Sequence, residues 1–419
     1  MNQTNTKRFL FVVWDGGGTI PPALTLASRV VAAGHIVRIL GPRSIEQKVK
    51  ALGADFSPYR RAPDRDPRKL DQDGKVKSPA SVAIAACAEY ADDVKETIAL
   101  SPVDIIVTDY ILTGAYIVAE ALAIPCASLV PTVYPLPAPG LPPFGSGFSL
   151  AKGPAGKIRD SVVNFLLQRL WNMNLKRLNE TRAQFGVSSV KSIKDQMLRA
   201  GRMLVLSSSV FDFPATLPAH TVYCGPQLED ASQFKSWKLP WNDKDKTPLV
   251  LVSLSTTYQA QDNVIRRLLR AVEDLPVHVM VTLGYSMSPD QFQAPANVTL
   301  VSFVPHQWIL PHTALAITHG GHGTVLGALS YGVPLICMPM GRDQGDVAAR
   351  VVWLGAGIRI SQKATPQTFR SAITRALNES GYRDKARTIA SMMARKNEPA
   401  RALIELETLI LERKGANVT

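Results

Sequence analysis

Several features that would indicate other classes of protein are missing from this sequence. No stretch reaches the ~20 consecutive apolar residues that a membrane-spanning helix needs, and the apolar run at the N-terminus is too short for a secretory signal. The cysteines Cys87, Cys126, Cys224 and Cys337 lie far apart and form no Cys-x-x-Cys pair, which argues against a zinc site or a redox pair. We therefore expect a cytoplasmic protein whose cysteines are reduced core residues.

Concentrated basic segments are also missing, although the net charge is +13. The charged stretches "RRAPDRDPRK" and "KSWKLPWNDKDK" mix both signs, and no basic run alternates with aromatic residues. A nucleic-acid partner is therefore not predicted. The excess positive charge suits a small anionic ligand and leaves open a peripheral contact with an anionic membrane.

The chain has 419 residues, enough for two domains, and its pattern begins twice. The apolar run "RFLFVVW" is followed by glycines, an amphipathic stretch and "IVRILG", which predicts a βαβ unit. The pattern restarts near Pro248 with "PLVLVSLSTT". We predict an α/β protein with two tandem Rossmann-like, doubly wound domains and a cleft between them. The predicted ranges are 1–225 for the N-terminal domain, 226–246 for a linker, 247–395 for the C-terminal domain, and 396–419 for a final helix that could pack back on the first domain.

The segment "ITHGGHGTVLGAL" predicts a strand ending at Thr318, a glycine-rich turn, and a helix starting near Thr324. The start of a helix has unpaired amide hydrogens and the positive end of the helix dipole. Glycines let an anion approach these amides closely, so the turn is typical of a phosphate site. A glycine-rich turn alone would be a weak signal.

Flanking motifs make the signal specific. With "FVPHQWILPH" before it and "GVPLICMPMGRDQ" after it, the turn resembles the signature of nucleotide-sugar glycosyltransferases of GT-B fold, in the UDP/dTDP-glycosyltransferase superfamily. The likeness is greatest to the bacterial branch that glycosylates macrolides and other natural products. The resemblance implies an acceptor-binding N-terminal domain and a donor-binding C-terminal domain.

The resemblance also implies a donor site. Phe303 would stack on the base, His319 would contact the pyrophosphate, and Asp343 would bond sugar hydroxyls. The implied donor-site residues are Ser255, Thr256, Phe303, Val304, His306, His319, Gly321, Gly323, Thr324, Asp343 and Gln344. We expect His322, on the same turn, to be exposed. Plant relatives that use UDP-sugars carry a ribose-binding glutamate where this chain has Gly327, which favours a dTDP-sugar and leaves UDP open.

We expect no metal and no other cofactor. Three Asp-x-Asp pairs, at 64–66, 71–73 and 243–245, imitate a metal motif but lie in charged, loop-like segments. The helix dipole and His319 would stabilise the departing diphosphate instead.

The base that most relatives use is absent. In those relatives a histidine after the first strand deprotonates the acceptor, and the matching position here is Thr19. Two carboxylates could replace it, Asp15 after the first strand and Asp109 after a later one, with Thr19 positioning the acceptor. A cap of the glycine turn is the competing interpretation for Asp15, and a helix cap for Asp109. His35 we interpret as structural.

The acceptor site is the variable part of the chain. The proline-rich segment 131–147 precedes an apolar helical stretch, which we expect mostly to pack on its own domain, with part of it lining an apolar pocket. The candidate acceptor residues are Trp14, Gly18, Tyr134, Phe144 and Phe165.

The sequence thus predicts an inverting, metal-independent glycosyltransferase that moves a sugar from a dTDP- or UDP-sugar to a hydrophobic small molecule. Two alternatives stay open: a transferase acting on a membrane lipid or sterol, and a non-catalytic nucleotide-sugar-binding protein. The sequence allows either a monomer or a homodimer.

Overall fold

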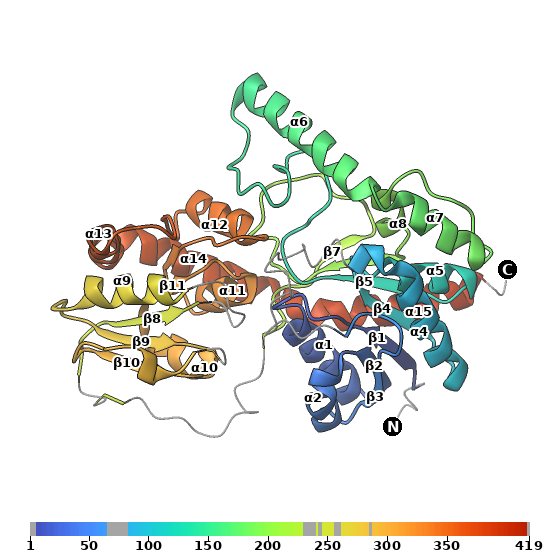
Figure 1. Ribbon diagram of the computed structural model, residues 1–419, viewed down its shortest axis with the longest axis horizontal. Coiled ribbons are helices and arrows are strands. Elements are labelled where there is room, and N and C mark those ends of the chain that lie inside the picture. Colours follow the sequence, from blue (N-terminus) through green and yellow to red (C-terminus); the bar gives the residue numbers. More distant parts are fainter. Residues whose placement is uncertain are drawn as a thin grey trace.

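The structure is a computed structural model that describes residues 6–64, 83–228, 240–241, 245–254, 261–284 and 287–416. Its two halves are built around separate parallel sheets with helices on their faces (Figure 1). This confirms the predicted class, two Rossmann-like α/β domains.

The N-terminal sheet has the order β3-β2-β1-β4-β5-β6-β7 in the part of the chain that the structure describes. Every neighbouring pair is parallel. The strands are β1 (Arg8–Val12), β2 (Ile36–Gly41), β3 (Asp55–Pro58), β4 (Ile105–Asp109), β5 (Cys126–Val130), β6 (Arg202–Val205) and β7 (Thr221–Tyr223). The helices are α1 (Ile20–Ala32), η1 (Arg43–Ile45), α2 (Glu46–Ala51), α4 (Cys87–Leu100), α5 (Thr113–Ala121), α6 (Gly153–Asn172), α7 (Leu175–Gln184) and α8 (Ile193–Met197).

The C-terminal sheet is also parallel, with the order β10-β9-β8-β11-β12-β13 among the described residues. Its strands are β8 (Leu249–Ser253), β9 (His278–Thr282), β10 (Val298–Val301), β11 (Thr313–Thr318), β12 (Leu335–Cys337) and β13 (Gly357–Arg359). Its helices are α9 (Asp262–Val272), η3 (Pro289–Gln291), α10 (His306–Ile309), η4 (Leu310–His312), α11 (His322–Ser330), α12 (Gln344–Trp353), α13 (Pro366–Asn378) and α14 (Ser380–Lys396). The short η5 (Glu398–Ala400) then leads into α15 (Arg401–Ala416).

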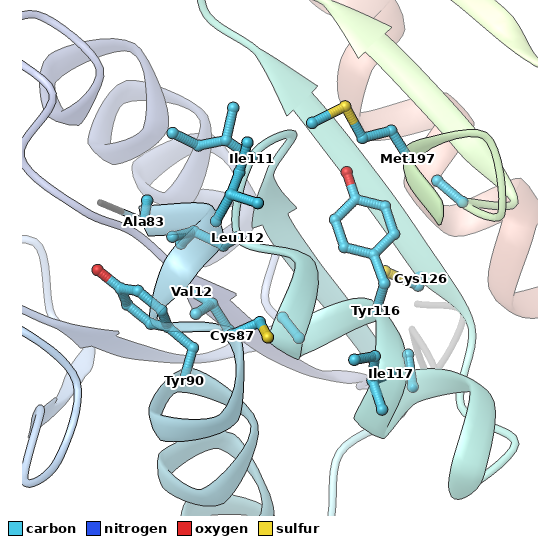
Figure 2. Close-up of a cluster of buried hydrophobic side chains, with 14 of the residues drawn as sticks. Val12, Ala83, Cys87, Tyr90, Ile111, Leu112, Tyr116, Ile117, Cys126 and Met197 are labelled. Carbon is cyan, nitrogen blue, oxygen red and sulfur yellow. The ribbon is translucent and has the colours of Figure 1, made fainter. Parts of the chain in front are cut away.

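The central strands are mostly apolar because helices cover both faces of each sheet. All residues of β4, β5 and β8 are buried. On one face of the N-terminal sheet, Val12, Cys87, Tyr116 and Met197 belong to a single buried cluster between strands and helices (Figure 2). All four cysteines are buried and unpaired, as predicted.

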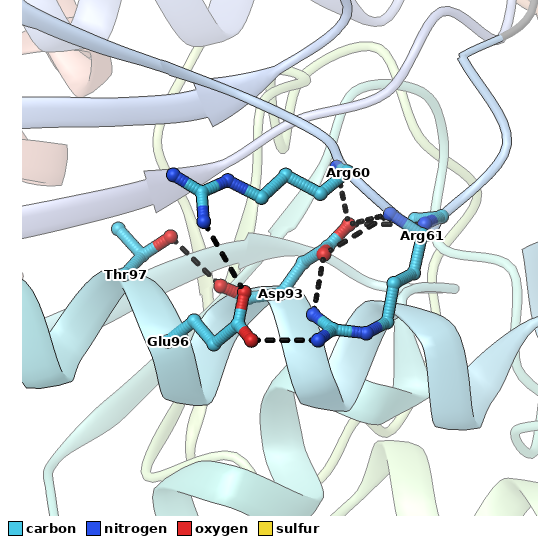
Figure 3. Close-up of polar contacts among 6 residues, drawn as sticks. Arg60, Arg61, Asp93, Glu96 and Thr97 are labelled. Atoms are coloured by element: carbon cyan, nitrogen blue, oxygen red, sulfur yellow. Dashed lines mark hydrogen bonds and ion pairs between the residues drawn. The ribbon is translucent and has the colours of Figure 1, made fainter.

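Asp93 of α4 fixes the chain that leaves β3. Its buried carboxylate accepts hydrogen bonds from the backbone N–H groups of Arg60, Arg61 and Ala62, and Glu96 pairs with the Arg61 guanidinium at 2.6 Å (Figure 3). A buried carboxylate needs such donors to offset its desolvation. This anchor holds the edge of the N-terminal sheet against α4.

The helix α15 returns to the N-terminal half. Its buried residues Ala402, Leu406, Leu409 and Ile410 pack in one cluster with β1 and α1. His35 contributes to this contact, since its Nε2 lies 3.0 Å from Glu407 Oε1 and its Nδ1 accepts the Lys7 N–H at 3.3 Å. The structural role predicted for His35 is therefore confirmed.

No helix in the described part of the chain is both long and apolar enough to span a membrane.

Candidate functional site

Loops at the carboxyl ends of the two sheets meet between the halves. The guanidinium of Arg342, which follows β12, donates to the Gly16 carbonyl after β1 at 2.7 Å. The Thr132 hydroxyl, after β5, donates to the Asp343 carboxylate. In doubly wound sheets this edge is where ligands bind.

The predicted glycine turn joins β11 to α11 on the C-terminal side of this meeting place. β11 ends at Thr318 as predicted, and α11 begins at His322, two residues earlier than the predicted start at Thr324. Its N-cap is Gly321, which has no side chain to bond the first helical amides. These amides and the positive end of the helix dipole are thus available to an anion.

His319 lies against this turn. A Cβ on Gly321 would be 2.6 Å from His319 Nε2, so only glycine lets the imidazole pack so closely on the backbone. Burial, with a smaller contribution from the Arg342 charge, lowers the pKa of His319 to about 4, against the raising effect of a main-chain hydrogen bond at Ser253. The ring is therefore neutral near pH 7 and carries one N–H, which can donate either to the Ser253 main chain or to a bound anion.

His322 is not exposed, so that expectation was wrong. It is 8% exposed, and its ring centroid lies 6.3 Å from that of Phe211 in the N-terminal half. The reason is the early start of α11, which places His322 in the helix rather than in the open turn. Its Nε2 has no hydrogen-bond partner among the described residues, and burial lowers its pKa to about 4.

The segment after β12 contacts the opposite half. Arg342 has a left-handed backbone, with φ of 55°, which is uncommon for a residue with a side chain and often marks a functional site. Asp343 is the N-cap of α12. The side-chain oxygen of Gln344 accepts the N–H groups of Met340 and Gly341, at 2.7 and 3.1 Å, and so shapes this loop.

On the N-terminal side, Asp109 lies at the end of β4 and lines a small cavity. The cavity has about 10 Å³ of space for the centre of a water molecule and is lined by Val13, Trp14, Thr19, Ala23, Asp109, Leu129, Pro131 and Leu206. That is about the space that one water needs. Burial raises the pKa of Asp109 to about 7, against the lowering effect of the Ile111 N–H and the Trp14 indole.

The two N–H groups near the Asp109 carboxyl, those of Ile111 and of the Trp14 indole, differ in whether they form a hydrogen bond. The Ile111 N–H donates to Asp109 Oδ1 at 3.2 Å. The buried indole N–H of Trp14 completes no hydrogen bond within the described structure. The Asp109 carboxyl thus keeps capacity for a further donor in an apolar cavity, which is the environment of a general base with a pKa near neutrality.

Asp15 and Thr19 hold the glycine loop of residues 14–19. Asp15 Oδ1 accepts the Gly17 N–H at 2.9 Å, which is a cap of the turn. The Thr19 hydroxyl donates to the Trp14 carbonyl at 2.6 Å and accepts the Gly16 N–H at 3.1 Å. Gly18 is exposed, with φ of 130°.

Two contacts between the halves were not predicted. The Asp346 carboxylate of α12 accepts the N–H groups of Gly145 and Gly147, at 2.5 and 2.7 Å. Arg350, one helical turn further, forms a buried ion pair with Asp212 at 2.6 Å. The sequence could not have indicated the ion pair, because Asp212 and Arg350 are 138 positions apart. Arg342 could have been found from the sequence, since it directly precedes the predicted Asp343.

The remaining residues of the predicted donor site, and the Asp-x-Asp pairs, do not share one environment. Ser255 and Thr256 lie outside the described residues, as do the Asp-x-Asp pairs apart from Asp64 and Asp245. Phe303 follows β10 and is 48% exposed, Val304 is buried, and His306 Nε2 lies 3.1 Å from Ser253 Oγ. Gly323 is exposed and Thr324 is in the first turn of α11.

The predicted acceptor residues are not all brought together. Of these, Trp14 lines the cavity with Asp109, and Gly18 is on the neighbouring loop. Tyr134 is 3% exposed in the N-terminal core, and Phe144 packs on the C-terminal core. Phe165 is 56% exposed on α6, because the opposite side of this helix faces the domain.

Comparison with known proteins gives one family and many relatives. Residues 266–409 match the family model described as erythromycin biosynthesis protein CIII-like, C-terminal domain. The chain is 26% identical to 4'-demethylrebeccamycin synthase of Lentzea aerocolonigenes over 420 aligned positions, which cover 96% of this chain and 99% of the relative.

Solved structures share the fold. The calicheamicin glycosyltransferase CalG4 matches with a TM-score of 0.78 and 23% identity, over 97% of this chain and 98% of the other. The glycosyltransferase VinC, solved in complex with dTDP, matches with a TM-score of 0.64 and 21% identity, over 95% and 99% of the two chains.

Proposed function

Because this chain is a nucleotide-sugar glycosyltransferase with the GT-B fold, related to those of bacterial natural-product biosynthesis, we propose that it transfers a sugar with inversion from a dTDP- or UDP-sugar to a hydrophobic small molecule. The observation that carries this proposal is the juxtaposition of two parts. A bare helix start with an imidazole lies on one side of the contact between the halves, and a buried carboxyl with a raised pKa lies on the other. We propose that it acts in the cytoplasm, where nucleotide sugars are made.

The donor would bind through the C-terminal half. The amides of His322 and Gly323 belong to the first turn of α11, and His319 Nε2 lies against Gly321 at the same turn, so that these groups would hold the diphosphate. The guanidinium of Arg342 adds positive charge near His319. These groups would carry the charge of the leaving diphosphate, so the reaction needs no metal ion. Phe303, exposed after β10, would stack on the base.

Asp109 is the base that we propose for the acceptor. In a single displacement, the acceptor hydroxyl gives its proton to the Asp109 carboxylate while its oxygen bonds to the anomeric carbon. The bond from this carbon to the diphosphate breaks, and the configuration inverts. A carboxyl with a pKa of about 7 is a much better base than one near 4, and it suits a phenol or another acidic hydroxyl.

The test replaces each carboxylate by its amide. In Asp109→Asn the amide oxygen can still accept the Ile111 N–H, so we expect a folded protein whose kcat falls about 100-fold or more. Asp15→Asn retains the oxygen that caps Gly17 and is the matched control, with a loss below about tenfold. Turnover of a panel of phenolic acceptors is the measurement, with dTDP and UDP sugars as donors.

The pH profile gives an independent readout. The base works only when it is ionised, so kcat/KM of the wild type should fall about tenfold per pH unit below pH 7 and level off above it. Asp109→Asn should lose this limb. If Asp109→Asn keeps wild-type turnover and the same limb, Asp109 is not the base. Tight binding of donor with neither turnover of any acceptor nor hydrolysis of the donor would favour a non-catalytic binding protein, whereas slow donor hydrolysis would argue for the enzyme.

One observation favours the second candidate, an acceptor that resides in a membrane. The helix α6 presents apolar side chains outward rather than to its own domain.

A further inference from the structure

Six large apolar side chains of α6 are each more than half exposed. They are Ile158, Val162, Phe165, Leu166 and Leu170, together with Met173 directly after the helix. Their spacing of three and four residues puts them on one side of the helix. We call these six residues the α6 face. Soluble proteins rarely expose so many neighbouring apolar side chains without a partner.

The α6 face is not a poorly packed part of the core. The opposite side of α6 is attached to its domain: Trp171 packs on the N-terminal core, Asn172 Oδ1 accepts the Ile193 N–H at 3.0 Å, and Asp160 is buried and bonded to Arg159. Both sides of the helix therefore have defined environments. The figure places α6 at the outer edge of the molecule, away from both sheets (Figure 1).

Positive charge surrounds the α6 face. Residues 152–177 include six lysines and arginines and one acid, Asp160. Three of the basic residues pair with acids, Arg159 with Asp160, Lys176 with Glu180 and Arg177 with Glu89, so the positive charge beside the face comes from Lys152, Lys157 and Arg169. Lys152 and Lys157 are exposed at the N-terminal end of α6. Arg169 lies within the face, with its guanidinium 4.9 Å from the centre of the Phe165 ring. A long basic side chain can bury its stem among apolar groups while its charge reaches an anionic headgroup.

We propose that the α6 face docks the protein on an anionic lipid bilayer. Apolar side chains that enter the headgroup region, with basic side chains on either side, are the combination that binds such surfaces. A second copy of this chain fits less well, because pairing two α6 faces would bring two stretches of net positive charge together. This docking goes beyond the proposed sugar transfer and does not depend on it.

Docking through α6 places the cleft close to the lipid. The segment 131–150 runs from β5, at the candidate site, to the start of α6. Its contacts Thr132 to Asp343 and Gly147 to Asp346 hold it against α12 on the way. An acceptor dissolved in the bilayer would then reach the candidate site along this segment.

The experiment is co-sedimentation of the full-length protein with vesicles. One set is phosphatidylcholine alone, and the other is an equal mixture of phosphatidylcholine and phosphatidylglycerol. We expect binding to the anionic vesicles, about tenfold or more above binding to the neutral ones, and weakening with added salt. Phe165→Ser with Leu166→Ser should lower the partition coefficient about tenfold or more.

Two controls separate the α6 face from general hydrophobicity and from misfolding. Leu100→Ser with Ile404→Ser removes two apolar side chains elsewhere that are at least as exposed, and it should leave vesicle binding unchanged. Thermal unfolding and dTDP binding should be unaltered in both double variants. The proposal is overturned if the wild type does not bind anionic vesicles, or if both double variants bind alike. It is also overturned if sedimentation velocity shows a dimer that Phe165→Ser with Leu166→Ser dissociates, because the face then joins two copies.

Discussion

His319 shows how one residue depends on its surroundings. Its imidazole is neutral because burial and the Arg342 charge lower its pKa to about 4. A neutral ring that donates one N–H to a diphosphate forms a charge-assisted hydrogen bond, which is stronger than a bond between neutral groups.

We predict that His319→Ala weakens dTDP binding by about 10- to 100-fold, which corresponds to about 1.5–3 kcal/mol for a hydrogen bond to a charged group. Calorimetric titration measures it, and His312→Ala, on an exposed histidine, is the control and should bind as the wild type does. The same titration compares dTDP with UDP. Unchanged affinity in His319→Ala would remove this histidine from the donor site, and tighter binding of UDP would refute the preference for dTDP.

Single residues also mark the limit of what the sequence could predict. Asp109 was named from its place at a strand end, but its raised pKa comes from burial among residues that directly follow β1 or belong to α1 and β5, which only the fold brings together. His322 was misjudged because the exact start of α11 decides whether it lies in the turn or in the helix. Local patterns locate a residue along the chain, whereas burial depends on what packs over it.

The β11–turn–α11 element is where backbone conformation and chemistry meet. Gly321 lets the His319 ring lie on the turn, whereas Gly327, within α11, has room for a methyl group 3.7 Å from Leu310. The same substitution should therefore have opposite effects at two positions in one element.

We expect Gly321→Ala to displace the imidazole and weaken dTDP binding about tenfold, by loss of its hydrogen bond. Gly327→Ala should leave binding unchanged and stabilise the fold by about 0.5–1 kcal/mol, because alanine favours a helix interior. Titration and chemical unfolding measure the two effects. Equal dTDP affinity in both variants would show that the contact between Gly321 and His319 does not matter to the donor.

Elements with a strong pattern were predicted well. The strands β1, β2 and β8 lie within the runs named from the sequence, and β11 ends at the predicted Thr318, because a strand covered on both faces is mostly apolar. The orientation of α6 was predicted less well. Its apolar residues were expected mostly to pack inward, and the structure turns six large apolar side chains outward, since a pattern of apolar residues does not say what lies opposite them.

At the scale of the whole molecule, the two halves are joined by contacts that no local pattern indicates. Among them, the pair between Arg350 and Asp212 is the most deeply buried ion pair, and the Arg350 guanidinium also lies 4.3 Å from the centre of the Phe213 ring. Removing one member of a buried pair leaves the other charge without compensation.

Arg350→Ala should therefore lower the free energy of unfolding by about 3–5 kcal/mol and reduce cooperativity between the halves. The double variant Arg350→Met with Asp212→Asn should be less destabilised than Arg350→Ala, because neither member of the pair is left as an unpaired charge. Arg375→Ala breaks an exposed pair with Glu379 and should cost below about 1 kcal/mol. Chemical unfolding of the four proteins measures this, and equal losses in Arg350→Ala and Arg375→Ala would contradict it.

The path of α15 has a mechanical consequence. The chain passes from the N-terminal half to the C-terminal half once between β7 and β8, and returns once through η5. Because α15 is packed into the first sheet, the second half is tethered twice, and the two crossings lie side by side where the Gln227 amide donates to the Pro399 carbonyl at 3.5 Å. The second half therefore cannot separate from the first unless α15 is pulled out of its contacts with β1 and α1.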